Sequence, residues 1–146
     1  GIIQGEVHDG KAHIMGGVAG NAGVFADIEA LSRFAQMMLN DGVLHGETIL
    51  KKETMELFKT SYTEGLNESR TMGGWYFGDL STSAGTRVSK HSLYHTGFAG
   101  TSIYIDFERK CGIVLLTNAI HPKRESPIAA IRKVFHEQLL DYIDRA

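Results

Sequence analysis

The stretch from Ser92 to Asn118 constrains the fold of this 146-residue chain most, because it predicts three consecutive short strands. We expect strands at 92–96, 101–106 and 112–117, with the second turn at 109–112. Gly97 and Gly100 bracket the first turn, where glycine adopts backbone angles that other residues resist. Apolar side chains then alternate as in a half-buried antiparallel sheet, at Ile103, Ile105, Val114 and Leu116.

A helix is predicted upstream of these strands. Asp27 is a favourable N-cap, and Asn40-Asp41-Gly42 is a typical stop signal. The residues between them carry one apolar stripe, at Ile28, Leu31, Phe34, Ala35, Met38 and Leu39. A second, shorter helix is expected at about 51–59, with Met55 and Phe58 facing inward.

Another helix is predicted at the end of the chain, after a turn at His121-Pro122. Ser126 is expected to cap it, and Pro127 to take the first helical position, where a missing N–H costs nothing. Its expected apolar stripe consists of Ile128, Ile131, Phe135, Leu139 and Tyr142.

The rest of the chain predicts one further strand and several loops. The segment GGWYFG at 73–78 resembles a strand, with Trp75 in the core or in a cleft wall, and 79–90 is expected to be a loop or a ragged hairpin. The first ten residues carry no helix signal, and we expect a loop there that is anchored by side-chain-to-backbone bonds. The glycine-rich segment 16–23 lacks the order of a phosphate-binding loop, so it predicts a tight turn packed against another backbone.

Composition and charge exclude several classes of protein. A net charge of −2 without a stripe of basic residues argues against a nucleic-acid partner. Cys111 is the single cysteine, so no disulfide forms within the chain, and we expect it to be structural. No run of 18 apolar residues occurs, and no signal peptide is in view. Length and composition are those of one globular domain with a core of its own.

The end of the first strand is the best candidate site. His95, Thr96 and Gly97 place a titratable side chain, a hydroxyl and a glycine at a strand edge, where a ligand's backbone could lie against the glycine. This combination predicts a dock for an anion or a carbonyl group. We expect no cofactor and no metal, because His91 and His95 are four residues apart on a strand, about 13 Å, too far to share an ion.

No serine of the chain has the surroundings of a nucleophile. None lies in a Gly-x-Ser-x-Gly turn and none is followed three residues later by lysine. Ser102 follows the first turn, but its neighbours indicate a strand residue. The residues themselves therefore predict a docking edge without a nucleophile.

Three motifs together resemble the C-terminal part of the serine β-lactamase and penicillin-binding superfamily. They are HTGFAGTSIYID followed by GIVLLTN, then the loop and helix VHDGKAHIMGGVAGNAGVFADIEALSRFAQMMLNDG, and the Gly-Trp strand. The resemblance covers residues 5–136 and is strongest for class C β-lactamase-related proteins that carry His-Thr-Gly. Asn21 departs from relatives that have histidine there, so we assign no role to the 16–23 loop.

The resemblance implies roles for four residues. His95 and Thr96 would bind the substrate's carboxylate or carbonyl side and help to position the catalytic base. Gly97 would leave room for substrate, and the N–H of Phe98 would be one donor of an oxyanion hole. The family's Ser-x-x-Lys nucleophile and Tyr-x-Asn base occur nowhere in the chain, so no catalytic residue is expected here.

The expected protein is therefore the C-terminal portion, 1–146, of a single β-lactamase-like domain. The predicted fold is α+β: an antiparallel sheet of three to four strands covered by a C-terminal helix, plus an N-terminal loop and helix. The parent would hydrolyse a β-lactam, a D-amino-acid peptide or an ester through an acyl-enzyme, and this chain alone would be inactive.

The alternative is a non-catalytic recognition or interaction module that keeps the docking edge. Expected partners are a small-molecule or peptide substrate, the missing N-terminal portion and a second copy of the chain. The resemblance implies a bacterial source and leaves export or association with the cell envelope open.

Overall fold

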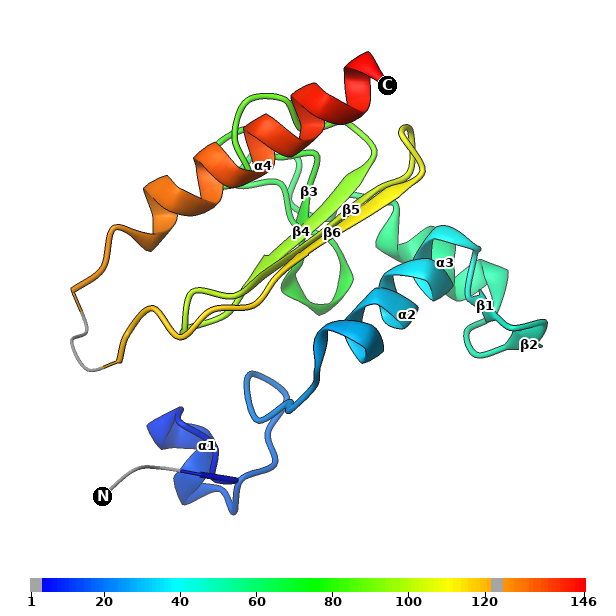
Figure 1. Ribbon diagram of the computed structural model, residues 1–146. Helices are drawn as coiled ribbons and strands as arrows, with labels where there is room; N and C mark the ends of the chain where they lie inside the picture. Colours follow the sequence, from blue (N-terminus) through cyan, green and yellow to red (C-terminus); the bar gives the residue numbers. More distant parts are fainter. Residues whose placement is uncertain (1–3, 122–124) are drawn as a thin grey trace.

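The computed structural model describes residues 4–121 and 125–146. The described chain contains two antiparallel sheets and four α-helices, joined by long loops (Figure 1). The elements follow in the order α1 (Gly10–Ile14), α2 (Ile28–Leu39), β1 (Val43–Leu44), β2 (Glu47–Thr48), α3 (Lys52–Phe58), a 3-10 turn (Met72–Gly74), β3 (Tyr76–Phe77), β4 (Ser92–Thr96), β5 (Ser102–Asp106), β6 (Cys111–Leu115) and α4 (Ile128–Arg145).

The main sheet has four strands in the order β3-β4-β5-β6, all antiparallel. The three strands predicted from the sequence are confirmed, with ends that differ by no more than two residues. The prediction of an α+β fold with an antiparallel sheet and a C-terminal helix is also confirmed. The β1–β2 hairpin was not predicted, because strands of two residues are too short to show an alternating pattern.

Helices cover both faces of this sheet. On one face, α2 and α3 pack on Leu93 and Ile105; on the other, Leu140 of α4 packs on Tyr94 and Tyr104. Figure 1 shows α4 lying across its face of the sheet, with α2 and α3 on the opposite side. The sheet is therefore buried on both faces and not half-buried as the alternating isoleucines indicated.

The helix α2 forms as its cap predicts. The Asp27 carboxylate accepts a hydrogen bond from the N–H of Ala30 at 2.8 Å, and the helix ends at Leu39. Ala35 and Met38 are buried, and Ala35 lies directly over Gly112 of β6, where a Cβ would come within 2.9 Å of the alanine methyl. The small residue on each side allows α2 to approach the sheet closely.

The face that α4 buries matches the predicted one only in part, since Phe135 and Leu139 of the predicted stripe pack against the core. Arg132, His136 and Leu140 are buried, whereas Ile131 and Tyr142 are 51% and 71% exposed. Periodicity failed here because two of the three buried positions are polar and are partnered by groups on the sheet. The start also differs: Pro127 is the N-cap residue and no side chain caps the helix. The predicted turn at 121–122 extends beyond the described residues.

Three further outcomes concern loops and short elements. The short helix α1 was not predicted, because its N-cap residue, Asp9, was expected to lie in a loop. The Asp9 carboxylate accepts a hydrogen bond from the N–H of Ala12 at 2.8 Å.

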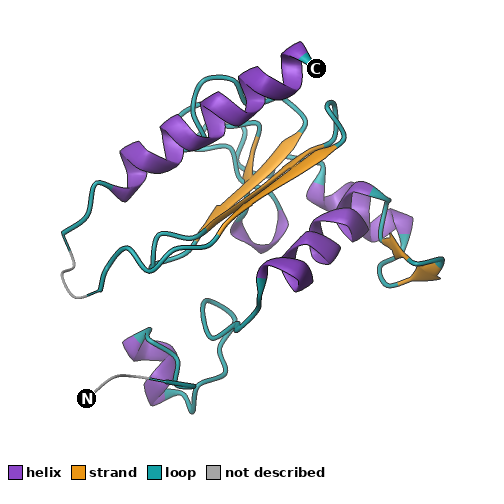
Figure 2. Cartoon of the chain, viewed as in Figure 1, coloured by secondary structure: helices purple, strands orange, loops and turns teal. Residues whose placement is uncertain are grey.

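The 79–90 segment is loop, as predicted (Figure 2). In the described part of the chain, no helix has the length and apolarity needed to cross a membrane.

The glycine-rich segment 16–23 is a tight loop, as predicted, but the backbone that it packs against is its own. Gly23 has a φ of +112°, and a Cβ at this residue would lie 2.6 Å from the carbonyl oxygen of Gly17. Val7 lies in van der Waals range of both positions. This close backbone contact fixes the loop relative to the residues just before α1.

Candidate functional site

The central feature of the candidate site is the end of β4, which extends past its neighbour β3. The two residues of β3 pair with Tyr94 and Leu93, so β3 begins at Tyr76, opposite Tyr94. His95 and Thr96 pair only with β5, opposite Ile103 and Ser102. We call the β3-facing side of residues 95–98 the docking edge.

Main-chain groups on the docking edge are free of ladder partners in the described structure. The N–H of Gly78 donates to the carbonyl of Ser92 at 2.9 Å, which shows that the main-chain groups of Ser92 point toward β3. Main-chain groups of successive strand residues point to alternate sides, so the N–H and C=O of Thr96, four residues later, also point toward β3. Gly74, which the register would place opposite Thr96, instead donates its N–H to the carbonyl of Thr71 at 3.1 Å. The N–H of Thr96 is thus left for a ligand.

His95 projects from the face of the sheet that α2 covers. Its ring centroid is 5.3 Å from that of Trp75, which in turn stacks on Phe34 at 6.2 Å. The His95 side chain nevertheless remains exposed to solvent. Partial burial of the ring, and then the positive charge of Arg70, lower the pKa of His95 below its usual value. A hydrogen bond with the Thr96 backbone opposes this shift. Near neutral pH the imidazole is therefore uncharged, with one donor and one acceptor nitrogen.

Arg70 contacts both the 3-10 turn and the first residue of β3. Its guanidinium is 3.4 Å from the ring centroid of Tyr76, and it donates to the carbonyl of Gly74 at 2.6 Å. Its Nε and Nη2 atoms both donate to the Oε2 oxygen of Glu68, and this ion pair neutralises much of its charge. The arginine thus supports the 3-10 turn that borders the docking edge.

Thr96 and His95 point to opposite faces of the sheet. Thr96 is half-buried on the α4 face, beside Ser102, whereas His95 shares its face with Leu93. The structure therefore brings the His95 side chain and the Thr96 main chain to the docking edge. Their two side chains do not converge.

Gly97 is required by the turn itself. Its N–H donates to the carbonyl of Thr101 at 2.8 Å, and a Cβ at this position would overlap the Thr101 hydroxyl. Gly100, with a φ of +94°, closes the turn by donating to the carbonyl of Gly97 at 3.0 Å. Ala99 accepts from the N–H of Ala119 and the hydroxyl of Thr117, both at 2.8 Å. The turn is therefore bound to the end of β6.

Phe98 occupies the tip of this turn and is 59% exposed. Its N–H lies in the turn after β4 and forms no hydrogen bond with the described residues. The ring of His8 lies against the Phe98 ring, with centroids 5.5 Å apart and planes at 73°. Sequence reasoning missed His8 as a site residue, because no local pattern links it to a turn ninety residues later.

Ser102 and His136 form a buried pair on the α4 face of the sheet. The Ser102 Oγ and His136 Nε2 are 3.0 Å apart, but the two residues are only 5% and 0% exposed. Burial, and then the charge of Arg132, lower the pKa of His136 to about 4. No substrate reaches this pair, so it is a structural contact between sheet and helix, and the prediction of Ser102 as a strand residue is confirmed.

The described part of the chain offers little support for a metal site, a reactive cysteine or an enclosed pocket at residues 95–98. No group of three histidine, cysteine or acidic side chains there is placed to hold a metal ion. Burial raises the pKa of the Cys111 thiol to about 11, which disfavours the reactive thiolate. Two hollows, of about 540 and 450 Å³, are lined by residues other than 95–98. The candidate site is thus an open strand edge and not an enclosed pocket.

Comparison with known proteins gives matches along most of the chain. The family model described as Beta-lactamase matches residues 3–136. An N-acetylmuramyl-L-alanine amidase of Bacillus subtilis is 37% identical over 82% of this chain and 27% of its own length. A putative D-alanyl-D-alanine carboxypeptidase of Escherichia coli K12 is 37% identical over 90% and 30%, and one of Salmonella typhi is 35% identical over 87% and 29%. The chain spans less than a third of the length of these relatives.

Proposed function

This chain belongs to the Beta-lactamase family, and on that premise we propose that it is the substrate-docking part of a serine hydrolase. The reaction would be acyl transfer from an amide or ester to a serine, followed by hydrolysis of the acyl-enzyme. The observation that carries the proposal is the docking edge, where the N–H groups of Thr96 and Phe98 lack ladder partners in the described structure.

In this proposal, each group at the docking edge has one role. The N–H of Phe98 is one oxyanion donor, and the nucleophile's own N–H is the second. Such a donor contributes about 3–4 kcal/mol to a working site. His95 hydrogen-bonds the substrate's carboxylate or carbonyl side and positions the catalytic base. Thr96 pairs with the substrate's backbone through its main chain.

The nucleophile and base are proposed to lie in a further part of the protein. Neither Ser-x-x-Lys nor Tyr-x-Asn occurs in the 146 residues, and the relatives are more than three times as long as the matched region. Relatives named as an amidase and as carboxypeptidases favour, within the proposal, a peptide amide of the cell-wall type that carries a free carboxylate.

The first test is to read the full reading frame for the two missing motifs and to assay the full-length protein. We expect hydrolysis of a D-alanyl-D-alanine peptide, nitrocefin or a p-nitrophenyl ester, and a covalent adduct on the upstream serine. His95→Ala should lower kcat/KM about ten- to hundredfold, the value of one hydrogen bond to a charged group. His91→Ala is the matched control, because His91 is exposed at the other end of β4 and pairs with Glu108.

Two results would contradict the proposal. A full-length protein without the motifs or without turnover would instead support a non-catalytic recognition module. Unchanged kinetics in His95→Ala would remove His95 from the site. The 146-residue chain by itself should give no turnover above buffer and no penicillin adduct by mass spectrometry.

A further inference from the structure

The contact between His8 and Phe98 brings a second imidazole to the docking edge. The two rings lie 5.5 Å apart between centroids, and both side chains are exposed. Phe98 also supplies the main-chain N–H that is the proposed oxyanion donor. A ligand bound along residues 95–98 would therefore meet His8 at the Phe98 end of the edge and His95 at the other.

The backbone around His8 is held in place from both sides. Asp9 accepts from the N–H of Ala12 through its carboxylate at 2.8 Å and from the N–H of His13 through its carbonyl at 2.9 Å. On the other side, Val7 contacts the tightly packed glycine loop. Among residues 4–121 and 125–146, none forms a hydrogen bond with the His8 ring. The imidazole is thus positioned by its neighbours, while its nitrogens are available to a ligand.

Hydrogen-bond donors and one cation border the edge, beside the main-chain carbonyl of Thr96. The N–H of Thr96 faces the edge, the N–H of Phe98 has no partner among the described residues, and the charge of Arg70 reaches His95. The nearby carboxylates already have partners: Glu68 binds Arg70, and Asp9 caps α1. A surface rich in donors favours a ligand with an anionic group.

We propose that His8 is a ligand-contacting residue of the docking edge and donates a hydrogen bond to the carboxylate of the bound ligand. This inference rests on the proposed function and adds to it a second residue that selects ligands with a free carboxylate. His8 takes no part in bond making or breaking. Its effect is on binding, and it should appear in KM more than in kcat.

The test compares substrates with and without the carboxylate in the full-length protein. His8→Phe keeps a ring against Phe98 but removes both nitrogens, and we expect it to raise KM about tenfold for a D-alanyl-D-alanine peptide. The same peptide with its terminal carboxylate amidated should change less than twofold. His8→Gln, which retains an N–H donor, should recover part of the loss. His13→Phe is the matched control from the same segment and should behave as wild type.

The outcomes separate this inference from the proposed function. If wild type is active but His8→Phe is unchanged, or is impaired equally with both peptides, His8 does not read the carboxylate and the inference alone fails. If wild type hydrolyses neither peptide nor ester, the proposed function fails and the inference with it.

Discussion

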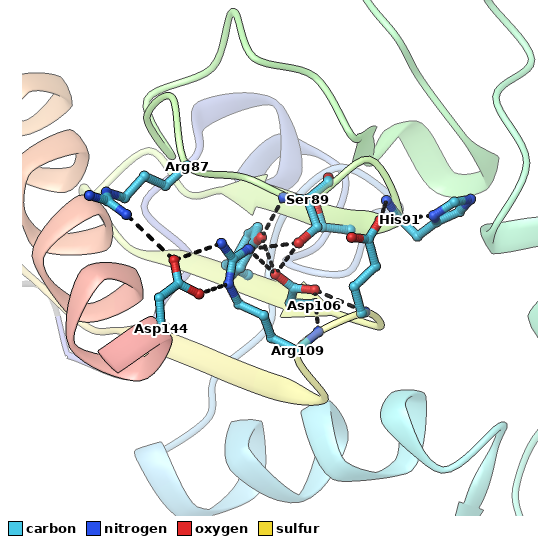
Figure 3. A network of polar contacts seen from close by, with 9 residues as sticks. Arg87, Ser89, His91, Asp106, Arg109 and Asp144 are labelled. Carbon is cyan, nitrogen blue, oxygen red and sulfur yellow. Dashed lines mark hydrogen bonds and ion pairs between the residues drawn. The ribbon is translucent and has the colours of Figure 1, made fainter. Parts of the chain in front are cut away.

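Replacing Asp106 by asparagine should destabilise the chain more than almost any other conservative change. Asp106 is fully buried at the end of β5, where its carboxylate accepts five hydrogen bonds (Figure 3). One oxygen accepts from the N–H groups of Glu108 and Arg109 at 3.0 and 2.9 Å. The other accepts from the Ser89 hydroxyl, the Tyr104 hydroxyl and the Arg109 guanidinium at 2.6, 2.7 and 2.9 Å.

The magnitude follows from which donors can adapt to an amide. Asparagine keeps one oxygen for the two backbone N–H groups but sets an NH₂ against the other three donors. The hydroxyls of Ser89 and Tyr104 can rotate to accept, whereas the guanidinium of Arg109 cannot. Breaking a buried charge pair of this kind costs about 3–5 kcal/mol, a large part of the roughly 5–15 kcal/mol that holds a domain together.

Acid dependence provides an independent check on Asp106. Desolvation raises its pKa, but the hydrogen bonds from Arg109, Ser89 and Tyr104 outweigh it, so the folded-state pKa is lowered. A lowered pKa means that the carboxylate stabilises the fold above its unfolded value of about 3.9 and that this contribution disappears as the pH falls further. The difference in unfolding free energy between wild type and Asp106→Asn should therefore shrink below about pH 4.

The assay is urea unfolding of both proteins from pH 7 to pH 3. Glu108→Gln is the matched control in the same turn: its side chain is about half exposed, pairs with exposed His91, and should change stability by less than about 0.5 kcal/mol. A loss below about 1 kcal/mol for Asp106→Asn at pH 7, or a difference that stays constant down to pH 3, would refute an ionised, fully bonded Asp106.

Two further predictions concern packing. Leu140→Ala should lower the free energy of unfolding in urea by about 2–5 kcal/mol, because Leu140 is fully buried on the sheet. Tyr142→Ala should lower it by less than about 1 kcal/mol, because Tyr142 is 71% exposed. The reverse order would mean that α4 buries Tyr142 and not Leu140. Val24 and Phe25 are 87% and 66% exposed, beside other apolar residues of the N-terminal segment, so the isolated chain should self-associate or bind a hydrophobic dye. Serine at both positions should weaken the self-association and the dye binding. A chain that sediments as a monomer and binds no dye would contradict this prediction.

The parts of the fold that could be predicted are those with local signals. Strands β5 and β6 follow from an apolar alternation, the turn before β5 follows from two glycines, and α2 follows from the Asp27 cap and one apolar stripe. In each case the information lies within about a dozen residues. Local pattern is sufficient there because the element's own backbone and one buried face determine it.

The polar part of the buried face of α4 could not be predicted, because its residues have partners on β5 or just before it, far away in the sequence. His136 is buried against the Ser102 hydroxyl, and Arg132 donates to the carbonyl of Thr101 at 3.2 Å. Without knowledge of the sheet, a histidine and an arginine at these positions indicate a solvated face. The same reasoning explains why His8 was missed: its significance comes entirely from a contact with Phe98.

The docking edge itself is a consequence of where β3 begins, which sequence periodicity did not resolve. Gly73 and Gly74, which the sequence predicts as part of a strand, have φ values of 70° and 77°, which an extended strand cannot contain. They turn the N–H of Gly74 toward Thr71, and so β3 has no residue to pair with Thr96. A longer β3 would occupy the main-chain groups that the proposed function needs. Two glycines preceding Trp75 therefore keep the edge open, while Trp75, one residue later, borders His95.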